Sequence, residues 1–125
     1  MRNAKRNKGK KIKNRNKKQV VDWMVLEVFE NPEDRNNPEC EVEFHTSPDF
    51  RKYGFGEIVV IGKVKNAEKI MNLINTFGRM LIKGKNFDSN VIHCIDDING
   101  VTKFKFGVVK YMVDGEKFIQ LIIVE

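Results

Sequence analysis

Two dipeptides that favour tight turns divide the last third of this chain into three apolar runs: Asn99-Gly100 and Asp114-Gly115. Each pair suits the two positive-φ positions of a type I′ turn, which joins neighbouring antiparallel strands. Residues 91–125 therefore predict a three-stranded antiparallel meander, so the fold must contain a β-sheet.

Gly107 interrupts the middle run of this meander. The apolar side chains lie at even positions before it, as at Phe104 and Phe106, and at odd positions after it, as at Val109 and Tyr111. One inserted residue reverses the face on which all later side chains of a strand lie. The shift therefore predicts a β-bulge at Gly107.

Three earlier stretches have the character of strands. Residues 20–30 and 55–65 are rich in β-branched and aromatic residues, and residues 40–44 alternate between apolar and acidic side chains. Such patterns are typical of buried and half-buried strands. The Pro- and Asn-rich residues 31–39 predict a solvated loop between the first two strands.

Residues 66–77 carry the strongest helical pattern. Asn66 suits the N-cap, and Gly78 suits the left-handed position that follows a helix. We therefore expect the helix to stop at Gly78 and residues 79–83 to form a short strand. The alternative is a longer helix that runs to Lys83, because Leu81 continues the apolar stripe. Together these elements predict an α+β fold, in which a mostly antiparallel sheet, including the C-terminal meander, has one main helix packed on one face.

The first 18 residues differ in composition from all others. They hold ten Lys or Arg and no Asp or Glu, with almost no apolar side chain. Such a segment has too little apolar surface to offset the entropy of ordering, so we expect residues 1–18 to be a disordered basic tail, here called the basic arm. Residues 19–125 are expected to form a single domain, since their length and apolar content suffice for one core.

Charge is segregated along the chain. The whole protein has a net charge of +6, yet the basic arm alone carries +10, so the remaining residues carry −4. Residues 22–49 hold nine acidic residues and one basic residue. The basic character therefore belongs to one end of the chain and is not spread over the folded surface.

A flexible run of cations can follow a phosphate backbone, because each neutralised phosphate releases condensed counterions. If about six of the ten charges engage, the logarithm of affinity should fall against the logarithm of salt concentration with a slope of about −5. The alternatives for this segment are a localisation signal, a contact with an acidic protein, and a solubilising tail. The residues expected to bind nucleic acid are Arg2, Lys5, Arg6, Lys8, Lys10, Lys11, Lys13, Arg15, Lys17 and Lys18.

A basic and aromatic loop follows the acidic stretch. Arg51, Lys52 and Tyr53 lie between Phe50 and Phe55 and form a second set of candidate nucleic-acid-binding residues. Aromatic faces in such a loop can stack on unpaired bases. The alternative is that Phe50 and Phe55 anchor the loop in the core.

Three Lys-x-Lys pairs occur further along the chain, beginning at Lys63, Lys83 and Lys103. On strands, both members of a pair point to the same face. Neighbouring strands would then gather the pairs into one six-lysine patch. The alternative is an ordinary solvated sheet face.

No cofactor, metal site or catalytic group is expected. The clustered carboxylates suggest a metal-dependent nuclease only as a minor alternative, since the accompanying nucleophile and base pattern is missing. His93 and Cys94 are neighbours on a predicted strand and face opposite sides, which disfavours zinc. Cys40 and Cys94 are expected to be reduced and half-buried. A further hypothesis is that the acidic stretch holds the basic arm loosely until a denser polyanion displaces it.

These features predict a non-enzymatic nucleic-acid-binding protein, with RNA or a ribonucleoprotein favoured over duplex DNA because no element reads as a recognition helix. The alternative is a small inhibitor or adaptor, of phage or viral type, that binds a host protein machine handling nucleic acid. No apolar run reaches the roughly 18 residues of a membrane span and no signal-peptide pattern is visible. We therefore expect no membrane partner and a cytoplasmic location, or a nuclear one in a eukaryote.

Overall fold

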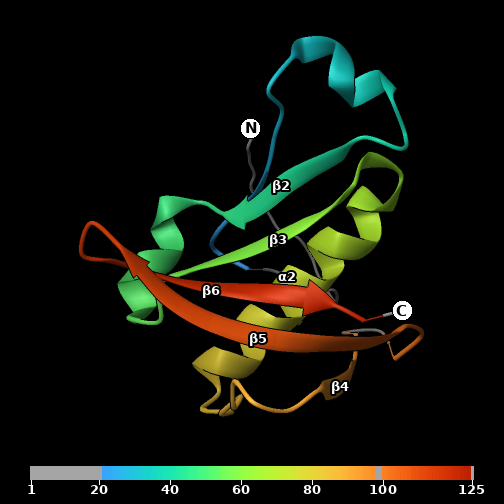
Figure 1. Cartoon of the computed structure of the whole chain (residues 1–125). Coiled ribbons are helices and arrows are strands. Elements are labelled where there is room, and N and C mark those ends of the chain that lie inside the picture. Colours follow the sequence, from blue (N-terminus) through green and yellow to red (C-terminus); the bar gives the residue numbers. More distant parts are fainter. Residues whose placement is uncertain (1–20, 98–99, 125) are drawn as a thin grey trace, which may run out of the picture.

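The computed structural model describes residues 21–97 and 100–124. Within them, six strands form one sheet in the order β1-β2-β3-β6-β5-β4, and α2 is the long helix (Figure 1). The strands are β1 (Val25–Val28), β2 (Glu41–Thr46), β3 (Glu57–Lys63), β4 (His93–Asp96), β5 (Lys103–Val113) and β6 (Glu116–Ile123). The helix α2 spans Ala67–Ile82, and in the described part of the chain three 3₁₀ turns precede it: η3 (Pro32–Asn36), η4 (Pro48–Tyr53) and η5 (Val64–Asn66). The α+β class is confirmed.

The sheet is mostly antiparallel, as expected. Among the strands of the described residues, only β3 and β6 run parallel, and the other neighbouring strands are antiparallel. The chain leaves β3 through η5 and α2, which cross one face of the sheet, and returns through the meander so that β6 pairs with β3. A parallel pair needs such a crossover connection, and α2 supplies it.

The meander predicted for residues 91–125 is confirmed by β4, β5 and β6. At the turn between β5 and β6, Asp114 has φ 52° and Gly115 has φ 81°, as a type I′ turn requires. Asn99, in the other predicted turn, lies outside the described residues.

The bulge predicted at Gly107 is wrong. The pairing of β5 with β6 runs without interruption from Phe106 opposite Ile123, through Gly107 opposite Ile122, to Val108 opposite Leu121. Burial continues at the even positions, with Val108 buried like Phe106. The apolar side chains at odd positions belong to the opposite face of the same regular strand, because both faces of the sheet are apolar here.

The strands expected near residues 40–44 and 55–65 are confirmed by β2 and β3, but β1 is much shorter than the stretch 20–30. Before β1, the Trp23 side chain is buried in the core. Met24 and Ser47 then tie the start of β1 to the end of β2. The Met24 amide donates to Ser47 Oγ over 3.0 Å, and the Ser47 amide donates to the Met24 carbonyl over 2.7 Å. Pairing therefore begins only after Trp23 has entered the core.

The helix does not stop at Gly78, and the short strand expected at residues 79–83 is wrong. Gly78 lies inside α2, where a Cβ atom would come within 2.9 Å of the Trp23 ring and 3.2 Å of the Phe50 ring. The glycine is needed there because two aromatic side chains pack against the helix backbone. Its role is close packing and not termination.

Gly84 ends the helix instead. Its φ is +96°, its amide donates to the carbonyl of Leu81, and the Lys85 amide donates to the carbonyl of Met80. This pair of hydrogen bonds is the Schellman arrangement, which satisfies carbonyls at a helix C-terminus and favours glycine at the left-handed position.

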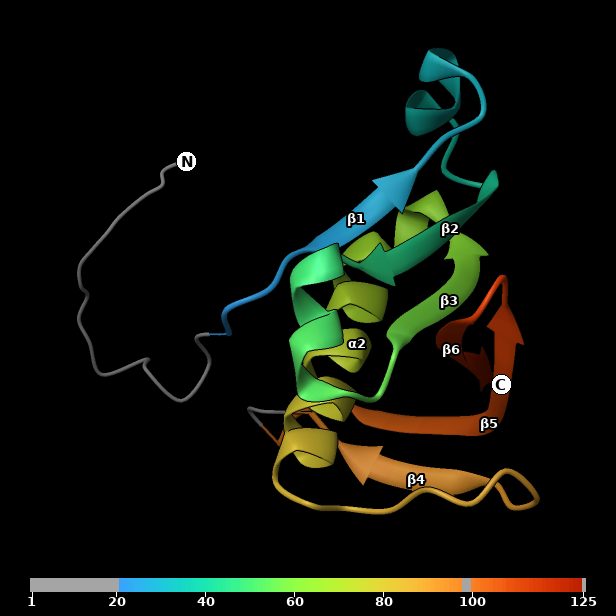
Figure 2. The same ribbon diagram turned by 90° about the vertical axis from the view of Figure 1, so that its left-hand side faces the viewer.

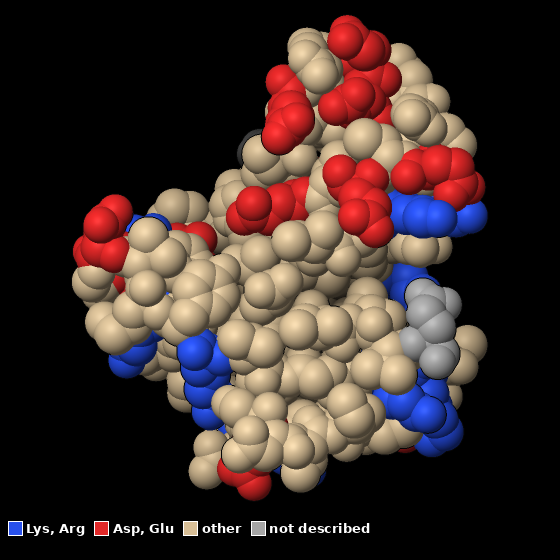
Figure 3. Space-filling view, viewed as in Figure 1, with Lys and Arg blue, Asp and Glu red and all other residues tan. Residues whose placement is uncertain are grey.

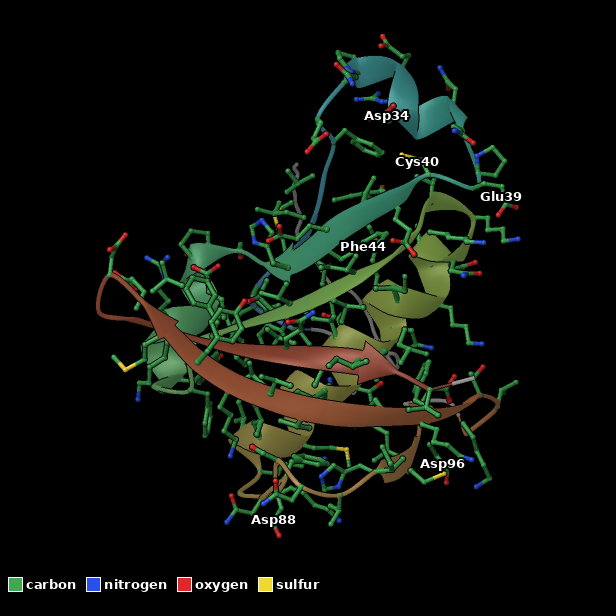
Figure 4. The ribbon with its side chains drawn as sticks, in the orientation of Figure 1. Asp34, Glu39, Cys40, Phe44, Asp88 and Asp96 are labelled. Carbon is green, nitrogen blue, oxygen red and sulfur yellow. The ribbon has the colours of Figure 1, made fainter. Side chains whose placement is uncertain are left out.

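The core lies between α2 and one face of the sheet (Figure 2). Side chains from the helix and from the central strands form one buried cluster, in which Phe44 points from β2 toward the helix (Figure 4). Each fully buried aliphatic or aromatic side chain stabilises the fold by about 1.5–3 kcal/mol relative to an exposed one. The helix contributes Ile70, Leu73, Ile74, Phe77 and Leu81, and the sheet contributes Phe44, Ile58, Val60, Phe106 and Leu121.

The opposite face of the sheet is not covered by any described element. The register places apolar side chains of β1, β3, β5 and β6 on this face, and each is between 37% and 54% exposed. Figure 3 views this face and shows a broad uncharged surface across β3, β6 and β5. We call it the open face and define it by Val28, Ile61, Val109, Tyr111, Val113 and Ile122.

Candidate nucleic-acid interface

The ten predicted residues of the basic arm lie outside the described residues, which begin at Val21. The structure does describe where the arm joins the body. The Trp23 ring packs edge-on against Phe50 at 4.8 Å between centroids, and its indole Nε1–H donates to Asn75 Oδ1 over 3.0 Å. The root of the arm is therefore fixed against α2 and η4.

Arg51, Lys52 and Tyr53 lie together at the end of η4, and each contacts a carboxylate of the body. Arg51 forms ion pairs with Glu57 and, over 3.5 Å, with Glu116. Lys52 Nζ lies 2.7 Å from Asp22 Oδ2, and the Tyr53 hydroxyl donates to Asp22 Oδ1.

Asp22 links the arm root to η4 electrostatically. The hydrogen bond from Lys52, followed by the one from Tyr53, lowers the pKa of Asp22 below its usual value. The same contact with Asp22 raises the pKa of Lys52 and that of Tyr53. Asp22 and Lys52 therefore stay charged and Tyr53 stays protonated near neutral pH, which keeps this junction intact.

The basic and aromatic loop thus has a structural role. Phe50 is fully buried and Phe55 packs against the core, which confirms the alternative that these two rings anchor the loop. Tyr53 packs against Trp23 and Phe50. Because the cations are paired and the rings are packed, this set offers less to a ligand than its sequence suggests.

A different group of cations surrounds a cavity at the C-terminal end of α2. The cavity has a volume of about 360 Å³ and lies between that end of the helix, the segment after Gly54, and the hairpin of β5 and β6. Lys85, Lys110 and Lys117 line it. We call these three lysines with the cavity the basic end. Nothing in the sequence singled out Lys110 or Lys117. The Lys-x-Lys pair of Lys83 and Lys85 suggested Lys85 only as part of a lysine patch on the sheet.

The expectation that the three Lys-x-Lys pairs form one six-lysine patch is wrong. Lys83 and Lys85 follow the end of α2 and lie on no strand, and Lys65 lies on η5. Lys63 and Lys65 both pair with Glu39, and Lys103 pairs with Asp96. The three pairs occupy separate parts of the molecule.

The connection between β1 and β2, together with the start of β2, carries six of the nine acidic residues of the acidic stretch, and the connection projects beyond the sheet (Figures 1 and 3). We call residues 29–43 the acidic lobe. Asp34 and Glu39 lie on it (Figure 4). Lys63, followed by Lys65, lowers the pKa of Glu39 to about 2. Glu41 and Glu43 lie on the exposed side of β2, as the alternation predicted.

Metal-ligand geometry does not occur in the part of the chain that the structure describes: no group of three or more His, Cys, Asp or Glu side chains there converges on a common point. His93 and Cys94 face opposite sides of β4, since His93 packs on Phe87 and Phe106 while Cys94 is exposed. Cys40 is half-buried as predicted, whereas the expectation of a half-buried Cys94 is wrong, because its strand lies at the sheet edge.

No protein-family model, no curated protein and no solved structure matches this chain. Among the helices of residues 21–97 and 100–124, none is long and apolar enough to cross a membrane.

Proposed function

We propose that this is a non-enzymatic nucleic-acid-binding protein in which the basic arm supplies affinity and the folded body directs it. RNA or a ribonucleoprotein is the favoured target over duplex DNA, and the proposed location is cytoplasmic, or nuclear in a eukaryote. The observation that carries the proposal is the segregation of charge, with +10 on residues 1–18 of a protein whose net charge is +6. A polyanion is the partner that such a segment binds most strongly.

The body supports this proposal through the position of its own charges. The arm root at Val21–Trp23 lies against the C-terminal half of α2, and Arg79 and Lys83 line a shallow hollow with these residues. The basic end lies beside the same end of the helix. The acidic lobe repels phosphate, so a nucleic acid held by the arm should lie along α2 and avoid the lobe.

The test compares the intact chain with a full-length variant in which all ten Lys and Arg residues of the arm are Gln. At about 50 mM salt, loss of about six phosphate contacts should weaken binding of labelled single-stranded RNA at least about 100-fold. Single-stranded DNA and duplex DNA are measured in parallel to rank the targets. Equal affinity of the two proteins for all three ligands would contradict the proposal.

The open face favours a second candidate function, the adaptor or inhibitor that binds a protein machine. Contiguous exposed apolar surface on this scale is typical of protein-binding sites. A full-length variant with Ile61→Lys and Val109→Lys should lose a protein partner captured by the intact chain and keep its affinity for RNA. Capture that survives both substitutions would remove the open face from this role.

A further inference from the structure

We propose that the cavity of the basic end binds one unpaired nucleotide of a single-stranded nucleic acid, with the base against its aromatic wall and a phosphate among its lysines. This inference rests on the proposed nucleic-acid function and adds to it a site on the folded body. It also explains a preference for single strands over duplexes, because a paired base is not free to enter a pocket.

The cavity has the size and lining of a small-molecule site. Its volume of about 360 Å³ falls within the usual range for ligand pockets, and aromatic and aliphatic side chains form most of its wall. Phe77 and Phe87 are buried and pack on each other at 4.5 Å between ring centroids, so they support the wall, whereas Phe55 is half-buried and is the ring of these three that a base can reach. An aromatic face of this kind is where an unpaired base stacks without regard to sequence.

Three cations from three different elements surround this apolar wall. Lys85 follows α2, Lys110 lies on β5 and Lys117 lies on β6. Lys117 Nζ donates to the Gly54 carbonyl over 2.9 Å, which fixes one side of the opening. Lys85 and Lys110 form no ion pair with the described residues, and no Asp or Glu lines the cavity.

This combination selects the chemistry of the ligand. An aromatic wall without carboxylates, bordered by lysines, fits a flat ring attached to an anion, as in a nucleoside phosphate. The site also lies close to the arm root, because Tyr53 and Ile82 line the hollow at the root, while the adjacent Gly54 and Leu81 line the cavity. A strand gripped by the arm therefore passes near the opening.

The first experiment maps backbone amide shifts of the intact, full-length chain on addition of adenosine 5′-monophosphate, adenosine or inorganic phosphate. The nucleotide should shift Gly54, Lys85, Asn86 and Met112 and bind at least about fivefold more tightly than either fragment. If inorganic phosphate shifts the same amides and binds as tightly as the nucleotide, the site recognises only an anion and the base contact is overturned. If adenosine does so, the role of the lysines is overturned. If no ligand shifts amides at this site, the whole proposal is overturned.

The second experiment measures single-stranded binding with two charge-matched double variants of the full chain. Lys85→Glu with Lys110→Glu should abolish the nucleotide shifts and weaken binding of a short single strand at least about tenfold more than Lys103→Glu with Lys105→Glu, whose side chains lie on the sheet face away from α2. Equal effects of the two variants would contradict the site.

An abasic strand separates this inference from the proposed function. The intact chain should bind an abasic strand of the same length about tenfold more weakly than one with bases, because only the base reaches the aromatic wall. If the arm binds both strands equally and in a salt-dependent way, the pocket proposal fails while the arm proposal stands. If the intact chain binds neither strand, both fail.

Discussion

The acidic lobe and the basic end lie on the same sheet and differ in both charge and support. The lobe projects from the sheet, and its turn η3 contains no buried residue. The basic end is built on Phe77, Phe87 and Leu81 of the core. The protein thus presents cations on a rigid base and carboxylates on an exposed loop.

This difference indicates which region positions a ligand and which excludes one. A binding site requires side chains held in place by packing, and the basic end has that support. A repelling surface requires only charge of the right sign, which an exposed lobe can supply.

The largest effect concerns the support beneath the arm root. Gly78→Val should lower the free energy of unfolding by about 2 kcal/mol, because the added Cβ atom would lie 2.9 Å from the Trp23 ring, and the resulting overlap outweighs the gain in helix propensity. Denaturant unfolding of the full chain measures it. In the lobe, Asn36→Val should change the same quantity by less than about 0.5 kcal/mol. Similar losses of stability at both sites would show that the acidic lobe is packed as tightly as the C-terminal half of α2.

A smaller effect concerns the electrostatic link at the arm root. Asp22→Asn removes the anion that contacts Lys52 and Tyr53 and should cost about 0.5–1 kcal/mol, since solvent screens this exposed ion pair. The pKa of Tyr53 should fall toward its usual value, because Asp22 raises it. Denaturant unfolding and a tyrosine titration in a Tyr111→Phe background measure the two effects. An unchanged Tyr53 titration would contradict the contact.

The lobe should act on nucleic acid through charge alone. Glu30→Gln, Glu33→Gln and Glu41→Gln together should raise the affinity for single-stranded RNA about threefold at low salt. The increase should disappear at high salt, where charges separated by more than a few ångströms are screened. Fluorescence anisotropy at two salt concentrations measures it. A decrease in affinity would mean that the lobe contributes to binding.

The smallest effect is the titration of Glu39. Its pKa of about 2 lies below the usual value of 4.5 because Lys63 and Lys65 donate to its carboxylate. A depressed folded pKa means that the stabilising contact is complete above about pH 4.5 and is lost as the pH falls toward 2. A side-chain NMR titration measures the midpoint, which Lys63→Gln should raise. A midpoint near 4.5 in the intact chain would show that these ion pairs do not persist in solution.

Local patterns in the sequence predicted much of the sheet. The turn residues Asp114-Gly115 and the alternation in β2 depend on short-range geometry, and both are confirmed. The end of α2 agrees with the alternative, in which Leu81 continues the apolar stripe, and not with the preferred stop at Gly78. Gly78 is a residue type typical of a helix stop, and its packing against the distant Trp23 arises only after folding. The prediction of a bulge at Gly107 was wrong for a related reason. Alternation along β5 shows that both of its faces carry apolar side chains, but it does not show which face the helix covers.

The candidate site was predicted less well than the fold. Arg51 and Lys52 resembled free cations because their partners, Glu57, Glu116 and Asp22, become neighbours only after folding. Lys110 and Lys117 are isolated in the sequence and join Lys85 only through the hairpin and the helix end. Charge content is visible in a sequence, whereas charge pairing is a property of the fold.

The most direct test of the account is the salt dependence of single-stranded RNA binding by the intact chain. Between about 50 and about 200 mM salt, about six contacts to a single strand give a slope of about −4 on logarithmic axes, which corresponds to about a 300-fold loss of affinity. The account predicts this slope for the intact protein and a slope of about −1 for the variant with a neutral arm, in which the lysines of the basic end still contact one phosphate. A shallow slope for the intact protein, or the same steep slope for both proteins, would contradict it.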